Sequence, residues 1–186
     1  MIGDTAFRPS RSTRNKDEES EAPYLRLYKR VFPILLRLAV DIDLVPRKMF
    51  RDLNAQLIHW FTNNSQYENQ ETVTLLSSCL DAVCSEDSGL RSYGAECVNE
   101  FVKWTIKQQS VKQESPLNVR SLLKRLYNMT SHPSAMQRLG ACMVFNHIYV
   151  MFREEPQLVS EYTLELLYHI FFCLKLAEDD LPYIGK

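Results

Sequence analysis

The chain has 186 residues, of which 45% are hydrophobic, so it is long enough to bury one core of ordinary domain size. Its 22 basic and 23 acidic residues leave a net charge of −1, which excludes the strongly basic composition typical of nucleic-acid-binding domains. Apolar residues recur at helical spacing rather than in alternation, which predicts an all-α fold of about seven helices.

Residues 1–21 are polar and charge-rich, with few large apolar side chains, and are predicted to form a disordered tail. The helical segment is expected to span residues 22–177, followed by a second tail over residues 178–186. Within this segment, the expected helices cover, in chain order, residues 23–40, 46–63, 68–83, 88–107, 116–130, 133–155 and 156–177.

Prolines and short polar side chains mark several of these boundaries. Pro133 disfavours helical geometry in the residue before it, and both Pro133 and Pro156 are placed to start the next helix. Ser85 to Ser88 supplies a turn and an N-cap for the helix that follows. The expected apolar face of the second helix consists of Met49, Phe50, Leu53, Leu57, Trp60 and Phe61.

The fourth, fifth and sixth helices also have apolar faces. Trp104 belongs to the expected apolar face of the fourth helix, and its truncation to alanine would cost roughly 3–5 kcal/mol if the ring is buried between helix pairs. The expected face of the fifth helix consists of Val119, Leu122, Leu123, Leu126 and Thr130. That of the sixth helix consists of Met136, Leu139, Gly140, Met143, Val144, His147, Ile148 and Met151.

An internal repeat links the fourth and sixth helices. The string LRSYGAECV starts at Leu90, and MQRLGACMV starts 46 residues later, which aligns Gly94 with Gly140. That offset lies within the roughly 40–47 residues of HEAT and armadillo units. Because glycine destabilises a helix interior by about 1 kcal/mol relative to alanine, a close approach by a neighbouring helix is expected at Gly140.

The last expected helix is apolar on more than one side and requires neighbours on both flanks. A single helical hairpin also needs further hairpins stacked against it to bury its apolar faces. The sequence therefore predicts a HEAT/armadillo-like α-solenoid of antiparallel helix pairs, with an uncapped C-terminal end.

No residue pattern of an enzyme or a metal site is found in the sequence, and no catalytic, cofactor-binding or metal-binding residue is predicted. The five cysteines lie in apolar helical runs without a CxxC pair, which is typical of reduced, buried thiols. His59, His132, His147 and His169 are far apart. We expect His147 to be a core histidine and His132 a turn residue. The longest apolar run is too short and too charged to span a membrane.

Two weaker patterns concern binding and modification. Basic side chains follow helix surfaces, and they indicate either ordinary solvent-exposed faces or a ridge that contacts a partner or phosphate. Ser65-Gln66 has the dipeptide form favoured by DNA-damage kinases, which makes Ser65 a candidate phosphorylation site. The basic residues concerned are Lys103, Lys107, Arg120, Lys124 and Arg125.

Several longer strings resemble the phosphatidylinositol-3-kinase-related kinases, in the branch recruited to DNA ends. They are LIHWFTNN (57–64), EFVKWTIKQ (100–108), KRLY (124–127), HPSAMQRLGA (132–141), FNHIY (145–149) and FREE (152–155). The resemblance covers residues 23–177 and indicates a piece from the N-terminal half of the family's helical scaffold. No ATP-binding or catalytic residue of the distant kinase domain carries over to it.

The resemblance implies a parent serine/threonine kinase that uses ATP and Mg²⁺. It also implies recruitment to DNA double-strand ends by the Ku heterodimer and a role in non-homologous end joining in the nucleus. For this segment it implies a scaffold role, with adjacent helical repeats as direct partners and no direct contact with nucleic acid or membrane. The alternative is a free-standing HEAT/armadillo-type adaptor that binds proteins on a concave face. Such an adaptor would need polar capping units, which the apolar last helix does not supply.

Overall fold

The computed structural model describes residues 22–63, 69–109 and 117–176, and these residues form seven α-helices and no strand. The all-α class and the helix count are therefore confirmed, with each described boundary within about two residues of the expected one. Residues 1–21 and 178–186, predicted to be tails, lie outside the described residues. The helices are α1 (Pro23–Leu38), α2 (Leu44–Asn63), α3 (Gln70–Val83), α4 (Ser88–Gln109), α5 (Leu117–Thr130), α6 (Ala135–Glu154) and α7 (Pro156–Lys175).

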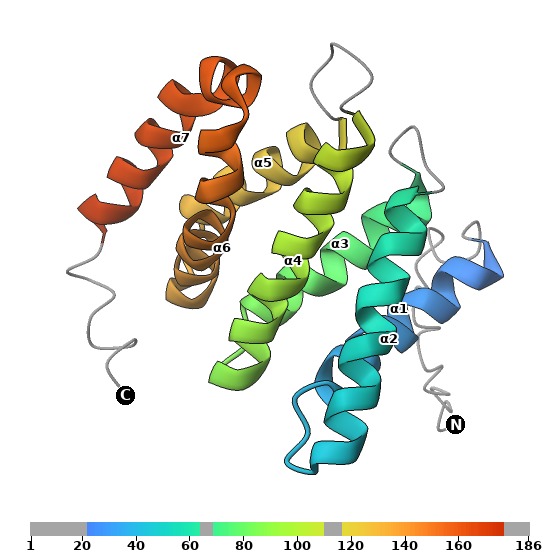
Figure 1. Ribbon diagram of the computed structural model, residues 1–186. Helices are drawn as coiled ribbons and strands as arrows, with labels where there is room; N and C mark the ends of the chain where they lie inside the picture. Colours follow the sequence, from blue (N-terminus) through green and yellow to red (C-terminus); the bar gives the residue numbers. More distant parts are fainter. Residues whose placement is uncertain (1–21, 64–68, 110–116, 177–186) are drawn as a thin grey trace, which may run out of the picture.

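The helices form two layers of a stack (Figure 1). Helices α2, α4 and α6 lie side by side in one layer, with α1, α3, α5 and α7 in the other. Pairs α1/α2, α3/α4 and α5/α6 are each packed together, and α7 contacts both α5 and α6. This arrangement is compatible with the predicted α-solenoid.

Side-chain caps and one buried arginine fix the helix starts. The Asp87 carboxylate accepts hydrogen bonds from the backbone N–H groups of Gly89 (2.8 Å) and Leu90 (3.1 Å), as the predicted cap at the start of α4 requires. Before α6, the Arg138 guanidinium donates to the backbone carbonyl oxygens of His132 and Pro133. Arg138 is therefore buried, although its charge would place it on the surface.

Both glycines of the repeat lie against the same residue, Val83, at the end of α3. A Cβ atom on Gly94 would lie 2.9 Å from the backbone nitrogen of Val83, and one on Gly140 would lie 3.0 Å from its carbonyl oxygen. The predicted close approach is thus confirmed. The two contacts are not equivalent, however. Gly94 of α4 contacts α3 within one helix pair, whereas Gly140 of α6 contacts α3 of the preceding pair.

The buried core includes residues of all seven helices. The helix faces that were predicted to be buried match this core to different degrees. The expected face of α5 is correct, since all five of its residues are buried. In α6 the buried stripe is rotated, so that Ala141, Phe145 and Phe152 are buried while the expected core histidine, His147, is only half-buried. The buried α6 residues are Arg138, Gly140, Ala141, Val144, Phe145, Ile148 and Phe152.

The predicted face of α2 was correct only in part: Phe61 is buried, and Phe50 and Leu57 pack against the core. Met49, Leu53 and Trp60 are exposed, and the buried α2 residues are Asn54, Ile58, Phe61 and Thr62. Two of these are polar, and each is hydrogen-bonded: the Thr62 hydroxyl donates to the Ile58 carbonyl oxygen (2.8 Å), as buried polar groups require.

Asn54 ties α2 to two neighbouring helices. Its side-chain nitrogen donates to the Leu35 carbonyl oxygen of α1 (3.1 Å) and to the Tyr93 hydroxyl of α4 (3.2 Å). One turn earlier, the Arg51 guanidinium lies 4.6 Å from the centre of the Tyr93 ring and donates to the Ala39 carbonyl oxygen (3.2 Å). These contacts set the register of α2 against both partners.

We expect Asn54→Ala to lower the free energy of unfolding by about 1–3 kcal/mol, because buried partners at Leu35 and Tyr93 lose their donor. Urea unfolding followed by circular dichroism measures this loss. The matched control is Asn146→Ala on exposed α6 surface, for which a change within about 0.5 kcal/mol is expected. Equal stability of the two variants would contradict the assigned role of Asn54.

Among the described helices, none combines the length and hydrophobicity required to cross a lipid bilayer.

Candidate interaction surfaces

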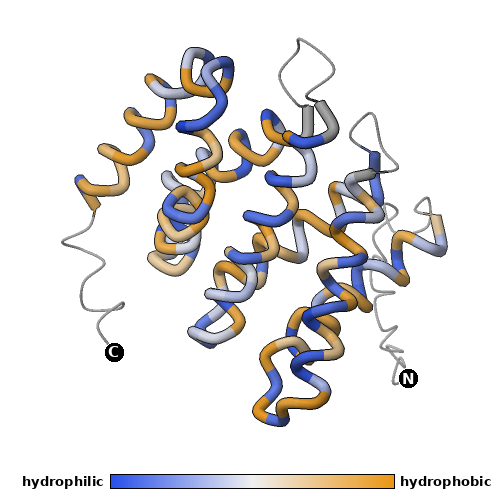
Figure 2. Tube along the Cα trace, in the orientation of Figure 1, coloured by the Kyte–Doolittle hydropathy of each residue, from blue (hydrophilic) through white to orange (hydrophobic). Residues whose placement is uncertain are grey.

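The last helix exposes a wide apolar face at the C-terminal end of the stack. Leu164 is 85% exposed and Phe171 is 66% exposed, although their spacing is that of a packed helix face. Figure 2 shows hydrophobic residues along the whole of α7. This confirms that α7 is apolar on more than one side. The α7 surface is defined here by Leu164, Leu167, Tyr168, Phe171 and Leu174.

The first helix pair exposes a second apolar stripe, on α2. Its members recur at intervals of four or seven residues, and Trp60 is 56% exposed. Arg51 and Asn54, which contact α4, project from the other side of the helix. The stripe therefore faces away from α4, on the N-terminal side of the described stack. The α2 surface is defined here by Val45, Met49, Leu53 and Trp60.

The α2 and α7 surfaces can each bury an additional helix, because the apolar residues of each follow one side of a helix. The two surfaces lie at opposite ends of the stack and are formed by apolar residues. A ligand cleft, in contrast, is concave and usually contains convergent polar groups. The chemistry that this geometry supports is helix association.

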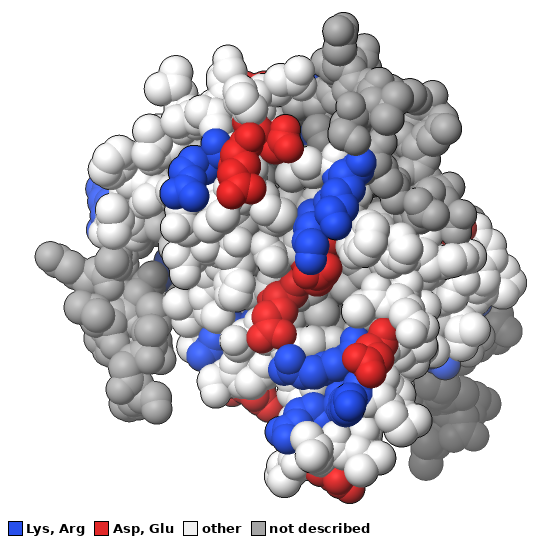
Figure 3. Space-filling model, in the orientation of Figure 1, with Lys and Arg blue, Asp and Glu red and all other residues white. Residues whose placement is uncertain are grey.

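Figure 3 shows basic and acidic side chains interspersed on the face formed by α2 and α4. Lys103 lies 2.9 Å from Glu100, and Arg51 on α2 lies 3.1 Å from Glu96 on α4. At the other end, Arg120 of α5 lies 2.7 Å from Glu161 of α7. These pairings fit an ordinary solvent-exposed surface better than a ridge of available cations.

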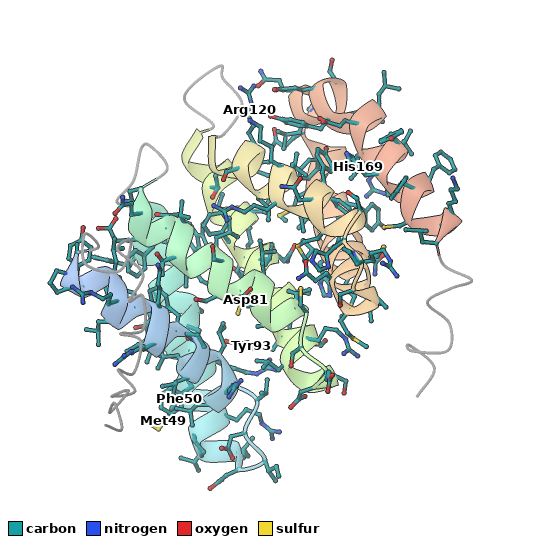
Figure 4. The ribbon with its side chains drawn as sticks, turned by 180° about the vertical axis from the view of Figure 1, so that it is seen from behind. Met49, Phe50, Asp81, Tyr93, Arg120 and His169 are labelled. Carbon is teal, nitrogen blue, oxygen red and sulfur yellow. The ribbon has the colours of Figure 1, made fainter. Side chains whose placement is uncertain are left out.

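The four histidines lie in different surroundings. His59 is exposed and stacks on Trp104, with ring centres 3.9 Å apart. His132 is the predicted turn residue, and its Nδ1 accepts from the backbone N–H of Ser134 (3.0 Å). His169 lies between α7 and α5 (Figure 4). Among the described residues, no three His, Cys, Asp or Glu side chains are grouped to hold a metal ion.

The cysteines are free thiols, but not all are buried as expected. Cys79 and Cys97 are buried, Cys84 is half-buried and Cys142 is exposed. A hydrogen bond with Cys97 is the main cause, and burial the second, that raises the pKa of the Cys79 thiol well above its ordinary value. Burial and the nearby carboxylate of Asp81 raise the pKa of Cys84 to about 11. Both thiols are therefore protonated at neutral pH, which disfavours nucleophilic chemistry.

Sequence reasoning assigned no role to His169 and did not identify the exposed stripe of α2. The stripe had a signal, since apolar residues on α2 extend around more than half of the helix. His169 had no local signal, because its partners on α5 lie about 40 residues earlier in the chain. Ser65, the candidate phosphorylation site, lies outside the described residues and stays a prediction.

The comparisons with known proteins agree in placing most of the chain within one family. A family model described as "DNA-dependent protein kinase catalytic subunit, CC1/2" matches residues 22–185. The chain is 45% identical over 188 residues to the DNA-dependent protein kinase catalytic subunit of Gallus gallus, which covers 100% of this chain. It is 48% identical to that of Canis lupus familiaris over 88% of this chain and 39% identical to that of Dictyostelium discoideum over 96%.

In each of these relatives, the aligned part is about 4% of the relative's own length. The matched region is helical, and the family model that matches it describes a part of the protein named CC1/2. The chain therefore belongs to the DNA-dependent protein kinase catalytic subunit family and corresponds to a helical segment of that protein.

Proposed function

We propose that this chain is a non-catalytic segment of the helical scaffold of a DNA-dependent serine/threonine kinase. The kinase would act in double-strand break repair by non-homologous end joining, in the nucleus. Family membership supports this proposal, as do the two-layer stack of helices and the small share of each relative that the chain spans.

The observation that carries the proposal is that both ends of the stack are apolar. Free-standing repeat proteins have terminal units with a polar outer face, which keep the stack soluble. Here Leu164 and Phe171 at one end and Trp60 at the other are more than half exposed. A segment between further helix pairs of the same long chain would bury both surfaces. The alternative, an independent adaptor, leaves them uncovered.

The proposed role is mechanical. Stacked helix pairs form an elastic wall in which small rotations between units add up over many repeats. At the level of the whole protein, the Ku heterodimer and DNA ends would be the partners, and ATP and Mg²⁺ would bind the kinase domain elsewhere in the chain. With a net charge of −1, the segment itself is proposed to contact adjacent repeats and not nucleic acid.

The proposal is tested in the full-length kinase with a double substitution on the α7 surface, Phe171→Glu with Leu174→Glu. Burying two carboxylates between units should loosen the scaffold, and kinase activity stimulated by DNA ends should fall several-fold at unchanged KM for ATP. The matched control is Lys124→Glu on exposed α5 surface. Full DNA-stimulated activity in the double variant would refute the scaffold role of this surface.

Expressed alone, the 186-residue chain is expected to self-associate through its uncovered apolar ends, mainly through the α7 surface. Analytical ultracentrifugation over a range of concentrations measures this association. Leu164→Glu with Phe171→Glu should shift the chain toward monomer with an unchanged circular dichroism spectrum, whereas Lys124→Glu should not. A monodisperse parent chain at high concentration would contradict the expectation and favour the adaptor alternative.

A further inference from the structure

Helix α1 exposes an apolar seam that has the spacing of a coiled coil. Its apolar residues recur at alternating intervals of three and four residues, which places them at the a and d positions of successive heptads. Leu27 is 57% exposed and Ile34 is 55% exposed. The core contacts a different side of the helix, through Leu25, Phe32 and Leu36. The α1 seam is defined here by Tyr24, Leu27, Val31, Ile34 and Leu38.

Helix α3, which lies next to α1 in the same layer, shows how such a side is covered inside the stack (Figure 1). Nine of the 14 residues of α3 are buried, because it packs between α1 and helices that follow it in the chain. Only three of the 16 residues of α1 are buried. Its packing partners among the described helices are α2, α3 and α4, all of which follow it. The difference in burial indicates that α1 lacks a neighbour that α3 has.

The charged side chains beside the α1 seam are all positive. Helix α1 contains four basic residues and no acidic residue. Arg30 and Arg37 both occupy g positions, each directly before an a position of the seam. Both are exposed and, unlike Arg51 and Arg120, form no ion pair with a described residue. Because e and g side chains of opposite charge pair across a helix interface, two arginines at g favour a partner helix with carboxylates.

A helix fits the α1 seam better than nucleic acid does. Phosphate groups are bound by cations and backbone N–H groups, and these contacts do not bury apolar side chains at heptad positions. A helix of the same polypeptide also fits better than a separate protein. Since α1 packs against helices that follow it, the side that they leave exposed is where the preceding helix pair of the proposed scaffold would pack.

We propose that the α1 seam binds a helix that precedes α1 in the same polypeptide, and that this helix carries Asp or Glu side chains opposite Arg30 and Arg37. The inference rests on the proposed scaffold function and adds the chemistry of the neighbouring helix. Guanidinium and carboxylate groups pair through two parallel hydrogen bonds, so the pairing is specific in geometry. A shift of the partner by one heptad would leave one arginine unpaired, and the two pairs would therefore fix the axial register.

Carbodiimide coupling in the full-length kinase tests the identity of the partner. Arg30→Lys keeps the positive charge and supplies a primary amine, which a carbodiimide joins to a carboxylate in direct contact. We expect mass spectrometry to find this amine linked to an Asp or Glu in a helix that precedes α1. Arg26→Lys, one turn earlier and off the seam, is the matched control and should not be linked to that helix. Linkage of the amine at position 30 only to residues 17–21, to another protein or to no carboxylate would overturn the proposal.

Hydrogen exchange of the full-length kinase separates this inference from the scaffold role. Arg30→Glu with Arg37→Glu should lower the protection of α1 relative to α4 by about two- to fivefold at low ionic strength, and by less at about 1 M salt. Leu27→Glu with Ile34→Glu should lower it at both ionic strengths, because carboxylates replace buried apolar groups. Loss of protection in the apolar variant alone would overturn the acidic partner and leave the scaffold role intact. Unchanged protection in both variants would overturn the α1 contact itself, while the α7 substitutions test the scaffold role independently.

Discussion

Gly94→Leu and Gly140→Leu are each expected to lower the free energy of unfolding by roughly 1–3 kcal/mol or more, through overpacking against α3. A Cβ atom on Gly94 would lie 2.9 Å from the backbone nitrogen of Val83 and 3.1 Å from the carbonyl carbon of Ala82. Neither backbone atom can move aside without moving α3. At Gly140 the nearest atoms are the carbonyl oxygen and a methyl group of Val83, both at 3.0 Å.

The matched control for these glycine substitutions is Gly89→Ala, at the start of α4. The nearest atom to a Cβ there is the Asp87 oxygen that caps α4, at 3.2 Å, and this exposed side chain, unlike the backbone of Val83, can shift by a few tenths of an ångström. Gly89→Ala should therefore change the stability by no more than about 0.5 kcal/mol. Urea unfolding at low protein concentration separates the three variants. Parent-like stability of Gly94→Leu would show that the contact between α3 and α4 is not close.

Both glycines should affect the same region, because Val83 is common to their contacts. Gly94 brings α4 onto α3 within one helix pair, whereas Gly140 brings α6 onto the end of the same helix from the next pair. We therefore expect the two glycine substitutions to be non-additive when combined. The glycine inside the sixth helix predicted the close approach at Gly140 correctly, but the sequence could not reveal that α4 and α6 both approach one residue.

The parts of the fold that could be predicted from sequence are those with strong local signals. Pro133 and Asp87 mark helix boundaries through their backbone geometry and capping chemistry, which need no tertiary partner. The α5 face was also predictable. Its leucines occupy a single stripe, and the polar side chains of Lys124 and Asn128 on the other side are exposed.

The α2 face could be predicted only in part, because apolar residues lie on its exposed side as well as on its buried side. Met49 and Trp60 are more hydrophobic than Asn54 and Thr62, but Asn54 and Thr62 are the buried residues. Asn54 is hydrogen-bonded to another helix and Thr62 to the α2 backbone. A helix at the end of a stack has two apolar sides, one for each neighbour. Periodicity alone does not tell which neighbour is present.

The same reasoning applies to the candidate surfaces. Helix α7 was predictable as a helix with two apolar sides, since Leu158 and Tyr162 are buried while Leu164 and Phe171 are exposed. The junction with α5 was not, because the position of His169 depends on how α7 docks and not on nearby residues. Long-range packing, rather than local pattern, therefore decides which polar side chains have a specific role.

Phe101→Ala is expected to cost about 3–5 kcal/mol, far more than Trp104→Ala on the next turn of the same helix. Phe101 is 2% exposed in the core beneath α4, so its removal leaves a cavity. Trp104 is not fully buried between helix pairs, so the larger cost does not apply to it: its ring is half-buried, stacked on exposed His59 and covered by the Lys107 amine at 4.8 Å. Trp104→Ala should therefore cost only about 1–2 kcal/mol. Urea unfolding of both variants measures the difference, and equal losses would mean that the face of α4 is assigned incorrectly.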